Sequence, residues 1–254
     1  MMDFNMFLTH IIFILPVLAI ATAAENITSN ITKKYDVKKV DISKKTYGGK
    51  ELTPSPKILT VTEEIWFDLK ISNYYGRGNH FKQRITIGCF GKSTPATCLN
   101  FVSFAKGFKK GELFMSYRGT KVQSIIRDFL IQLGDVKSRF PSSVSIYGTR
   151  FHDENFDLSH TSAGWVGMAN FGPDSNGSQF YVVLRRARWL DGKHVIFGKV
   201  IKGMDALETL AQEETREDNT PLRAVVLENC GVVGLKVPYN LTADQLNTDG
   251  DIKK

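Results

Sequence analysis

Apolar and polar residues alternate along much of this chain, most regularly after residue 60. Val61, Ile65, Phe67, Leu69 and Ile71 fall on odd positions among polar neighbours. A strand places successive side chains on opposite faces, so this spacing predicts a first strand with one buried face. Similar short apolar runs predict further strands at 84–90, 121–126, 129–133, 166–169, 180–184, 195–200 and 224–233.

Two segments show the signals of helices instead. Residues 93–95 read Ser-Thr-Pro, which offers an N-cap followed by proline in the first turn, and an apolar stripe follows over 99–105. A second helix fits 204–212, directly after Gly203. Many short strands with two helices predict a mainly β fold, a closed antiparallel barrel whose ends are covered by helices.

The N-terminal residues 1–24 have the composition of a cleavable signal peptide. Residues 6–24 form an apolar run interrupted by His10 and Pro16, and the run ends in small residues suited to signal peptidase. The usual preceding positive charge is missing and the run approaches the ~20 residues that span a bilayer, so a retained membrane anchor is the alternative. Cleavage would place the remaining chain in the secretory pathway, in the endoplasmic reticulum lumen or secreted, without a stable membrane span.

The rest of the chain divides by composition into three parts. A lysine-rich polar stretch at 25–57 is expected to be a flexible basic arm, and prolines near its end mark the boundary with a domain at 58–236. The polar segment 237–254 shows no regular apolar pattern, and we expect it to be a loose C-terminal tail.

Four positions meet the acceptor pattern for N-linked glycosylation, which matters in a secreted chain. Asn26 and Asn30 lie in the arm and Asn240 lies in the tail, and these three are candidate glycosylation sites. Asn176 precedes Gly177 in a standard tight-turn pair, so its overlap with the acceptor pattern is expected to be incidental.

The composition narrows the classes of partner and cofactor. The net charge of +7 becomes +8 once Asp3 leaves with the signal peptide, because Asp3 is the only charged side chain there. The lysines are scattered, so we interpret the charge as a solvated basic face and expect no nucleic-acid partner. Cys89, Cys98 and Cys230 form no metal-binding pattern, and they allow either one disulfide of undetermined pairing or three free thiols. No metal or other cofactor is expected.

A series of short motifs begins at Phe90 and becomes dense over 164–200. The motifs are Phe90-Gly91-Lys92, Asp128-Phe129, Gln132, Gly134-Asp135, Ser145-Ile146-Tyr147-Gly148, Asp153-Glu154-Asn155-Phe156, Met168-Ala169-Asn170, Asn176-Gly177-Ser178-Gln179-Phe180 and Trp189-Leu190-Asp191-Gly192-Lys193-His194. In this order they resemble the cyclophilin family of peptidyl-prolyl cis-trans isomerases, most closely the secretory cyclophilin B type. The resemblance covers about residues 61–236 and implies a closed antiparallel eight-stranded barrel capped by two helices.

The resemblance implies a rotamase that acts on the peptide bond preceding proline. Amide resonance gives this rotation a barrier of ~18–20 kcal/mol. An enzyme lowers the barrier by holding the proline and stabilising the twisted amide, which requires no nucleophile or metal. The implied substrate-binding residues are Phe129, Leu130, Tyr181, Leu190 and His194 in an apolar proline pocket, Gln132, Ala169, Asn170 and Gln179 along the substrate backbone, and Trp189 at the rim where such proteins bind cyclosporin. Without the resemblance, the apolar members of this set would read as ordinary core residues.

The chain departs from the family pattern at the residue that matters most for catalysis. Ser124 stands where the family carries its catalytic arginine, and a short neutral hydroxyl does not replace a charge-assisted donor. Arg127 and Lys121 lie at odd offsets from Ser124, so in a strand their side chains leave by the opposite face. We therefore expect no other cation to take over this role.

Three further departures concern the shape of the groove. Phe171 replaces a small alanine and should narrow the approach to the groove. The loop at 136–144 lacks the family's repeated glycines and carries Phe140 and Pro141, which should stiffen it. Tyr181 replaces phenylalanine in the pocket floor, and its hydroxyl needs a partner if it is buried.

Two functions fit this pattern. The first is a monomeric secretory isomerase that assists protein folding at Xaa-Pro bonds, weakened by Ser124. The alternative is an inactive cyclophilin-like chaperone or escort that binds proline-containing segments of a client. Ser124, Phe171 and Phe140 favour the alternative or a slow enzyme with a narrowed substrate range. Cyclosporin binding is expected to survive weakly, because Trp189 is kept while Phe171 crowds the groove. An idle structural protein would not account for the retained polar groove residues.

Overall fold

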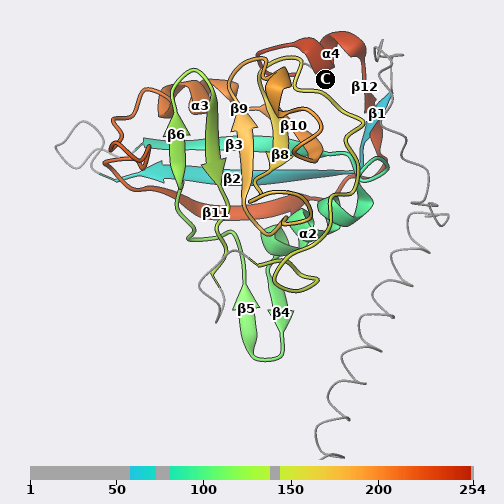
Figure 1. Ribbon diagram of the computed structural model, residues 1–254, viewed down its shortest axis with the longest axis horizontal. Helices are drawn as coiled ribbons and strands as arrows, with labels where there is room; N and C mark the ends of the chain where they lie inside the picture. Colours follow the sequence, from blue (N-terminus) through green and yellow to red (C-terminus); the bar gives the residue numbers. More distant parts are fainter. Residues whose placement is uncertain (1–57, 73–80, 138–143, 253–254) are drawn as a thin grey trace, which may run out of the picture. The chain divides into compact units, whose positions relative to one another are not determined.

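The computed structural model describes residues 58–72, 81–137 and 144–252. The centre of the fold is one antiparallel eight-stranded sheet with the order β11-β2-β3-β10-β8-β9-β7-β6 (Figure 1). All eight strands were predicted from the apolar pattern, with ends that differ by a few residues. They are β2 (Glu63–Ile71), β3 (Phe81–Cys89), β6 (Ser124–Ile126), β7 (Leu130–Leu133), β8 (Trp165–Met168), β9 (Phe180–Val183), β10 (Ile196–Lys202) and β11 (Val225–Val233).

The sheet curls until its two ends meet, which confirms the predicted barrel. Backbone hydrogen bonds join the segment preceding β6 to β11. Gly119 N donates to Leu227 O at 2.7 Å, and Val122 N donates to Val225 O at 2.9 Å. Closure of this kind satisfies backbone groups that would otherwise form an exposed sheet edge.

Aromatic rings fill the interior of the barrel. The ring of Phe101 lies 5.0 Å from that of Phe180 and 4.9 Å from that of Phe197, in edge-to-face arrangements that aromatic pairs favour. The alternation along β2 has the predicted consequence, because its apolar residues Ile65 and Phe67 are fully buried. Since side chains occupy the interior, a binding site must be sought on the outside of the barrel.

Helix α2 (Pro95–Lys106) begins where the Ser-Thr-Pro sequence predicts, but its cap comes from elsewhere. Thr94 occupies the N-cap position and makes no capping hydrogen bond with its side chain. The Glu154 carboxylate instead accepts hydrogen bonds from the backbone nitrogens of Ala96 and Thr97, both at 2.9 Å. A negative charge is favourable at a helix N-terminus, where backbone N–H groups lack partners.

Buried Asn100 ties α2 to two loops, which precede β8 and β9. Its Nδ2 donates to Gly177 O and its Oδ1 accepts from Ile146 N, both at 2.9 Å. The two loops also bind each other, since Asp153 N donates to Asp174 Oδ1 at 2.8 Å. The first turns of α2 and these loops therefore form one hydrogen-bonded block.

A disulfide joins Cys89 at the end of β3 to Cys98 in α2, and Cys230 in β11 is a free thiol. The sequence left this pairing open. In the fold the paired residues have Cα atoms 6.0 Å apart, a normal separation for a disulfide. Burial raises the pKa of Cys230, which favours its protonated, less reactive form.

The C-terminal segment 239–252 is ordered and packed, so the expectation of a loose tail was wrong. Strand β12 (Tyr239–Leu241) pairs with β1 (Leu59–Val61), two strands that were not predicted. A third helix, α4 (Ala243–Asn247), also not predicted, begins with a capping box between Thr242 and Gln245. The segment also buries three apolar side chains, those of Leu241, Leu246 and Ile252.

Lys199 of β10 binds this C-terminal segment through hydrogen bonds of its buried side chain. The side chain is fully buried, and its Nζ donates to Ala163 O at 2.7 Å, Ser162 Oγ at 3.0 Å and Thr248 O at 3.1 Å. Burial lowers the pKa of Lys199 to about 8, against the opposing influence of Asp249. Three hydrogen bonds thus compensate one buried amine and bind the chain end to the barrel.

One further helix was predicted from the sequence, and one hairpin was not. The second predicted helix is α3 (Met204–Leu210), somewhat shorter than expected. The hairpin of β4 (Phe108–Lys110) and β5 (Leu113–Met115), which projects from the barrel in Figure 1, was not predicted.

The predicted signal peptide, the predicted arm, Asn26 and Asn30 lie outside the described residues. In the described part of the chain, no helix has both the length and the apolar character needed to cross a bilayer.

The two acceptor asparagines within the described residues differ in accessibility. Asn240 in β12 is exposed. Asn176 is fully buried, and its Nδ2 donates to Asp153 Oδ1 at 2.8 Å. A buried, hydrogen-bonded amide nitrogen cannot carry a glycan in the folded protein, which agrees with the view that this match is incidental.

Candidate functional site

One row of residues crosses four strands on the outside of the barrel. Strand pairing sets Ser124 of β6 opposite Gln132 of β7, Gln132 opposite Tyr181 of β9, and Tyr181 opposite Gly167 of β8. Residues directly opposite one another in antiparallel strands point to the same face. Their chain neighbours, such as Ile131, point into the barrel core. The row therefore underlies a site on the outer surface.

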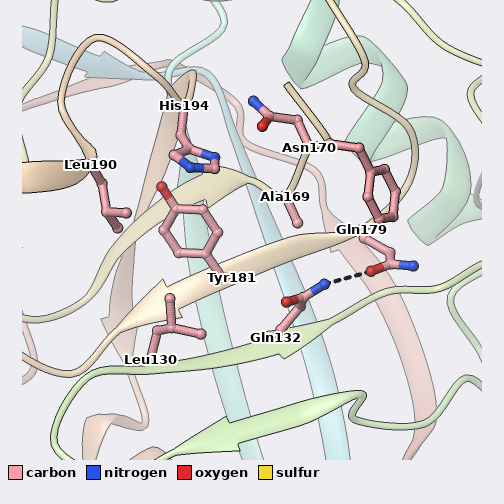
Figure 2. A pocket seen from close by; sticks show the side chains of 9 residues that line it. Leu130, Gln132, Ala169, Asn170, Gln179, Tyr181, Leu190 and His194 are labelled. Atoms are coloured by element: carbon pink, nitrogen blue, oxygen red, sulfur yellow. Dashed lines mark hydrogen bonds between the residues drawn. The ribbon is translucent and has the colours of Figure 1, made fainter. Parts of the chain in front are cut away.

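A pocket of about 210 Å³ opens over this row. Figure 2 shows Leu130, Tyr181 and Leu190 on one side of it and the amides of Gln132, Asn170 and Gln179 on the other. Every lining residue belongs to the groove set inferred from the sequence. The lining consists of Leu130, Gln132, Ala169, Asn170, Phe171, Gln179, Tyr181, Leu190 and His194. An apolar end beside convergent polar groups is typical of a site for a small ring attached to a polar backbone.

The two glutamines are held by a short chain of hydrogen bonds. Gln132 Nε2 donates to Gln179 Oε1 at 2.6 Å, and Gln179 Nε2 donates to Asp135 Oδ1 at 3.0 Å. Because the amide nitrogen of Gln132 is bonded to Gln179, the amide oxygen of Gln132 points toward the pocket (Figure 2). A carbonyl in this place can accept a hydrogen bond from a peptide N–H.

Asn170 and His194 are positioned by backbone carbonyls on the opposite wall. Asn170 Nδ2 donates to Lys193 O at 2.9 Å, and His194 Nδ1 donates to Met168 O at 3.0 Å. A neutral imidazole carries one ring proton, so this bond assigns it to Nδ1. The Nδ1 donor of His194 is therefore directed at the backbone and not at the pocket.

The remaining two predicted binding residues form an aromatic rim. Phe129 and Trp189 do not line the pocket itself, but their ring centroids lie 5.4 Å apart. Trp189 belongs to the short 3₁₀ helix η1 (Arg188–Leu190) and is 55% exposed. The same helix ends with Leu190, which lines the pocket, so the rim and the pocket share one element.

Ser124 lies at one end of the row, opposite Gln132; it is half-buried and does not itself line the pocket. Among the described residues, the pocket lining contains no lysine or arginine. Arg127 and Lys121 are exposed and lie beyond the ends of β6, and neither lines the pocket. The described lining thus offers neutral hydrogen-bonding groups and no positive charge of its own.

Phe171 forms part of the pocket wall, as the sequence suggested, although most of its ring faces solvent. It is 74% exposed, and the guanidinium of Arg150 lies over the ring at 5.3 Å from its centre. Its backbone N donates to Ser175 Oγ at 2.8 Å, which fixes the turn that carries it. The loop residues Phe140 and Pro141 lie outside the described residues.

The hydroxyl of Tyr181 has the buried partner that it requires. Its Oη lies 2.9 Å from His160 Nε2, and His160 Nδ1 lies 2.8 Å from Asp191 Oδ1. His160 is fully buried, and burial lowers its pKa, which keeps the ring neutral. Burial likewise raises the pKa of Tyr181 and keeps its hydroxyl protonated.

No role for His160, Asp191 or Gly167 was predicted from the sequence. These residues come from three separate segments, and their spacing carries no signal that they meet at Tyr181. The requirement that a buried tyrosine hydroxyl have a partner was the only indication available.

Several known proteins are similar to this chain over most of its length. The family model "Cyclophilin type peptidyl-prolyl cis-trans isomerase/CLD" matches residues 76–232. The rhodopsin-specific isozyme of peptidyl-prolyl cis-trans isomerase from Calliphora vicina is 40% identical over 198 residues, covering 76% of this chain and 79% of that protein. Peptidyl-prolyl cis-trans isomerase CYP21-1 of Arabidopsis thaliana is 43% identical over 155 residues (59% and 69%). Peptidyl-prolyl cis-trans isomerase B of Saccharomyces cerevisiae is 38% identical over 175 residues (67% and 80%).

Proposed function

The chain belongs to the cyclophilin-type peptidyl-prolyl cis-trans isomerase family, and we propose that it is a slow member that binds Xaa-Pro segments of proteins in the secretory pathway. The observation that carries this proposal is the pocket above the row from Ser124 to Gly167. It combines an apolar end with positioned amides, but its described lining holds no cation.

The apolar end suits a prolyl ring. Leu130, Tyr181 and Leu190 supply the surfaces against which the ring would lie. On the other side, the carbonyl of Gln132 and the backbone beside Asn170 can bind the peptide on either side of the proline. Holding the ring while the preceding carbonyl rotates favours the twisted amide over the planar one.

We expect a slow rate because the described lining contains no positively charged hydrogen-bond donor. The twisted amide has a basic prolyl nitrogen, and a charge-assisted donor would stabilise it. Ser124 can donate one neutral hydrogen bond from a short side chain. Loss of one transition-state donor typically costs ~2.7–4 kcal/mol, which corresponds to roughly a hundredfold to a thousandfold in rate.

The second candidate function is that of an escort, which binds proline-containing segments without catalysis. Phe171 favours this reading together with Ser124, because a ring that narrows the approach to the groove limits the range of Xaa-Pro segments that could be turned over.

The disulfide between Cys89 and Cys98 supports the secretory location, because such bonds persist in oxidising compartments. The apolar N-terminal run and the exposed acceptor residue Asn240 are consistent with the same route. A glycosidase-sensitive mass shift that disappears in Asn240→Gln would support entry into this pathway and modification at this residue. A cytosolic protein without such a shift in any form would contradict the location.

The function itself is tested by an isomerase assay on a short proline peptide with the wild type and Ser124→Arg. We expect the wild type to be at least about tenfold slower than a cyclophilin that carries the arginine, and Ser124→Arg to recover part of the difference. Gln123→Arg is the matched control, because it adds the same charge at the residue directly before β6, where the side chain leaves by the opposite side of the chain from Ser124. A wild-type rate equal to that of the arginine-bearing protein, unchanged in Ser124→Arg, would contradict the proposal. Measurable peptide binding with no turnover in either form would favour the escort.

A further inference from the structure

The direction of the hydrogen bonds at the apolar end of the pocket can be assigned from chemistry. Asp191 accepts a hydrogen bond from the backbone N of His160 at 2.9 Å as well as facing its Nδ1. These hydrogen bonds lower the pKa of Asp191 in spite of its desolvation, so the group is a carboxylate that can only accept. His160 must therefore hold its single ring proton on Nδ1.

This assignment fixes the proton of Tyr181. With its proton on Nδ1, neutral His160 presents a bare Nε2, which can only accept. The hydroxyl of Tyr181 must donate to it across the 2.9 Å contact. The Tyr181 oxygen then has no proton left for the pocket and offers lone pairs alone.

The oxygen of Tyr181 lies at the pocket end that would receive a prolyl ring. Figure 2 shows the hydroxyl at the edge of the pocket, on the side of Leu190 and His194. The rings of Tyr181 and His194 meet edge to face, with centroids 5.4 Å apart. Leu190 is apolar, and His194 directs its Nδ1 away from the pocket, toward Met168 O.

We propose that this pocket selects prolyl residues that carry a hydroxyl group at Cγ, and that Tyr181 accepts a hydrogen bond from that hydroxyl. Asp191 and His160 are positioning residues, since they act by turning the Tyr181 proton away from the ligand. This inference rests on the proposed function, because it requires the prolyl ring to occupy the apolar end of the pocket. The reaction that must supply the preferred substrate is hydroxylation of prolyl residues in the client.

The wild-type protein tests this through three otherwise identical peptides, in which the central residue is proline, γ-hydroxyproline or γ-fluoroproline. Fluorine is the matched control, because it withdraws electrons from the ring as the hydroxyl does but cannot donate a hydrogen bond. We expect the dissociation constant measured by calorimetry to be about two- to tenfold lower for the hydroxylated peptide than for the other two, the size of one net hydrogen bond. Equal affinities for the hydroxyl and fluoro peptides would overturn the inference.

Tyr181→Phe supplies the complementary measurement. The variant keeps the ring and removes the acceptor, so the preference should disappear or reverse, since a buried ligand hydroxyl would lack a partner. A preference of unchanged size in Tyr181→Phe would overturn the assignment to Tyr181. Wild-type binding of the proline peptide without any preference defeats this inference and leaves the proposed function intact, whereas failure of the wild type to bind any of the three peptides defeats both.

Discussion

The hydroxyl end of the Tyr181 ring lies against the backbone of Gly167, its partner on the neighbouring strand. A β-carbon at residue 167 would come within 2.5 Å of the Tyr181 hydroxyl oxygen and 2.6 Å of the ring carbon that bears it. The pocket floor can take this form only because residue 167 has no side chain. Gly167 and Tyr181 are therefore complementary, and neither can be changed without consequence for the other.

Gly167→Ala should displace Tyr181 and disturb its bond to His160. We expect a loss of about 1–3 kcal/mol in the free energy of unfolding, the usual cost of overpacking, and weaker binding of proline peptides. Urea unfolding and calorimetry measure the two effects. In the double variant with Tyr181→Leu, most of the added cost of the alanine should vanish because the clashing atoms are gone. Strict additivity of the two single changes would show that the residues are not coupled.

Phe171→Ala should widen the pocket entrance. The ring is part of the wall, so its removal should strengthen the binding of cyclosporin and of peptides with a bulky residue before proline, by about threefold or more. Titration calorimetry measures both ligands. Phe114→Ala is the matched control, because Phe114 is also largely exposed (66%) but lies on the β4–β5 hairpin. Full-strength cyclosporin binding by the wild type would contradict the expectation that Phe171 crowds the site.

Lys199→Met should loosen the C-terminal segment. The change leaves the carbonyls of Ala163 and Thr248 without their buried donor, and we expect a loss of about 1–3 kcal/mol in the free energy of unfolding. Limited proteolysis should then cut within 239–252 more readily. Lys202→Met, at an exposed position of the same strand, is the control and should have little effect. Unchanged protection of the segment in Lys199→Met would show that the amine does not hold it.

The same lysine predicts a specific dependence on pH. Its pKa is about 8 in the folded protein and 10.5 in the unfolded chain. Between these values the unfolded chain binds a proton that the folded protein has released, so the contribution of Lys199 to stability rises with pH. The difference in unfolding free energy between wild type and Lys199→Met should therefore increase across this interval. A constant or decreasing difference would contradict the depressed pKa.

His160 should make the protein sensitive to acid. Burial depresses its folded pKa below 6.5, so below pH 6.5 the unfolded chain binds a proton that the folded protein does not, and stability falls. His160→Gln should be less stable near neutrality but show a smaller loss on acidification. His152→Gln removes a histidine whose side chain is 90% exposed and should leave the slope unchanged. Equal slopes in the wild type and His160→Gln would exclude this group as the cause.

The barrel could be predicted from the sequence because β2 alternates apolar and polar residues and the other strands are short apolar runs bounded by turn residues. Ile65 and Phe67 follow a period of two, and a period of this kind leaves one arrangement that buries them. Leu241, Leu246 and Ile252 follow no such period, since their spacings of five and six residues suit neither a strand nor a helix face. Packing against the barrel determines the order of that segment, and the sequence alone does not carry that information.

The groove was predictable for a different reason. Gln132, Asn170 and Gln179 lie in motifs that recur as a set, so resemblance brought them together before the structure did. Tyr181 departs from that set, and its partners His160 and Asp191 could be found only from coordinates. Cys89 and Cys98 likewise needed the fold to bring them together, because their spacing in the sequence does not exclude pairing with Cys230.

The bonds of Asn100 have a consequence for the motions of the groove. Through Gly177 and Ile146, this one side chain connects the first turns of α2 with the loops on which the pocket wall is built. Segments joined through a shared buried amide open together and exchange their amide hydrogens as one cooperative unit. The pocket wall should therefore move together with α2, although this helix does not line the pocket. Widening of the groove should be a slow, collective motion rather than a local movement of one loop.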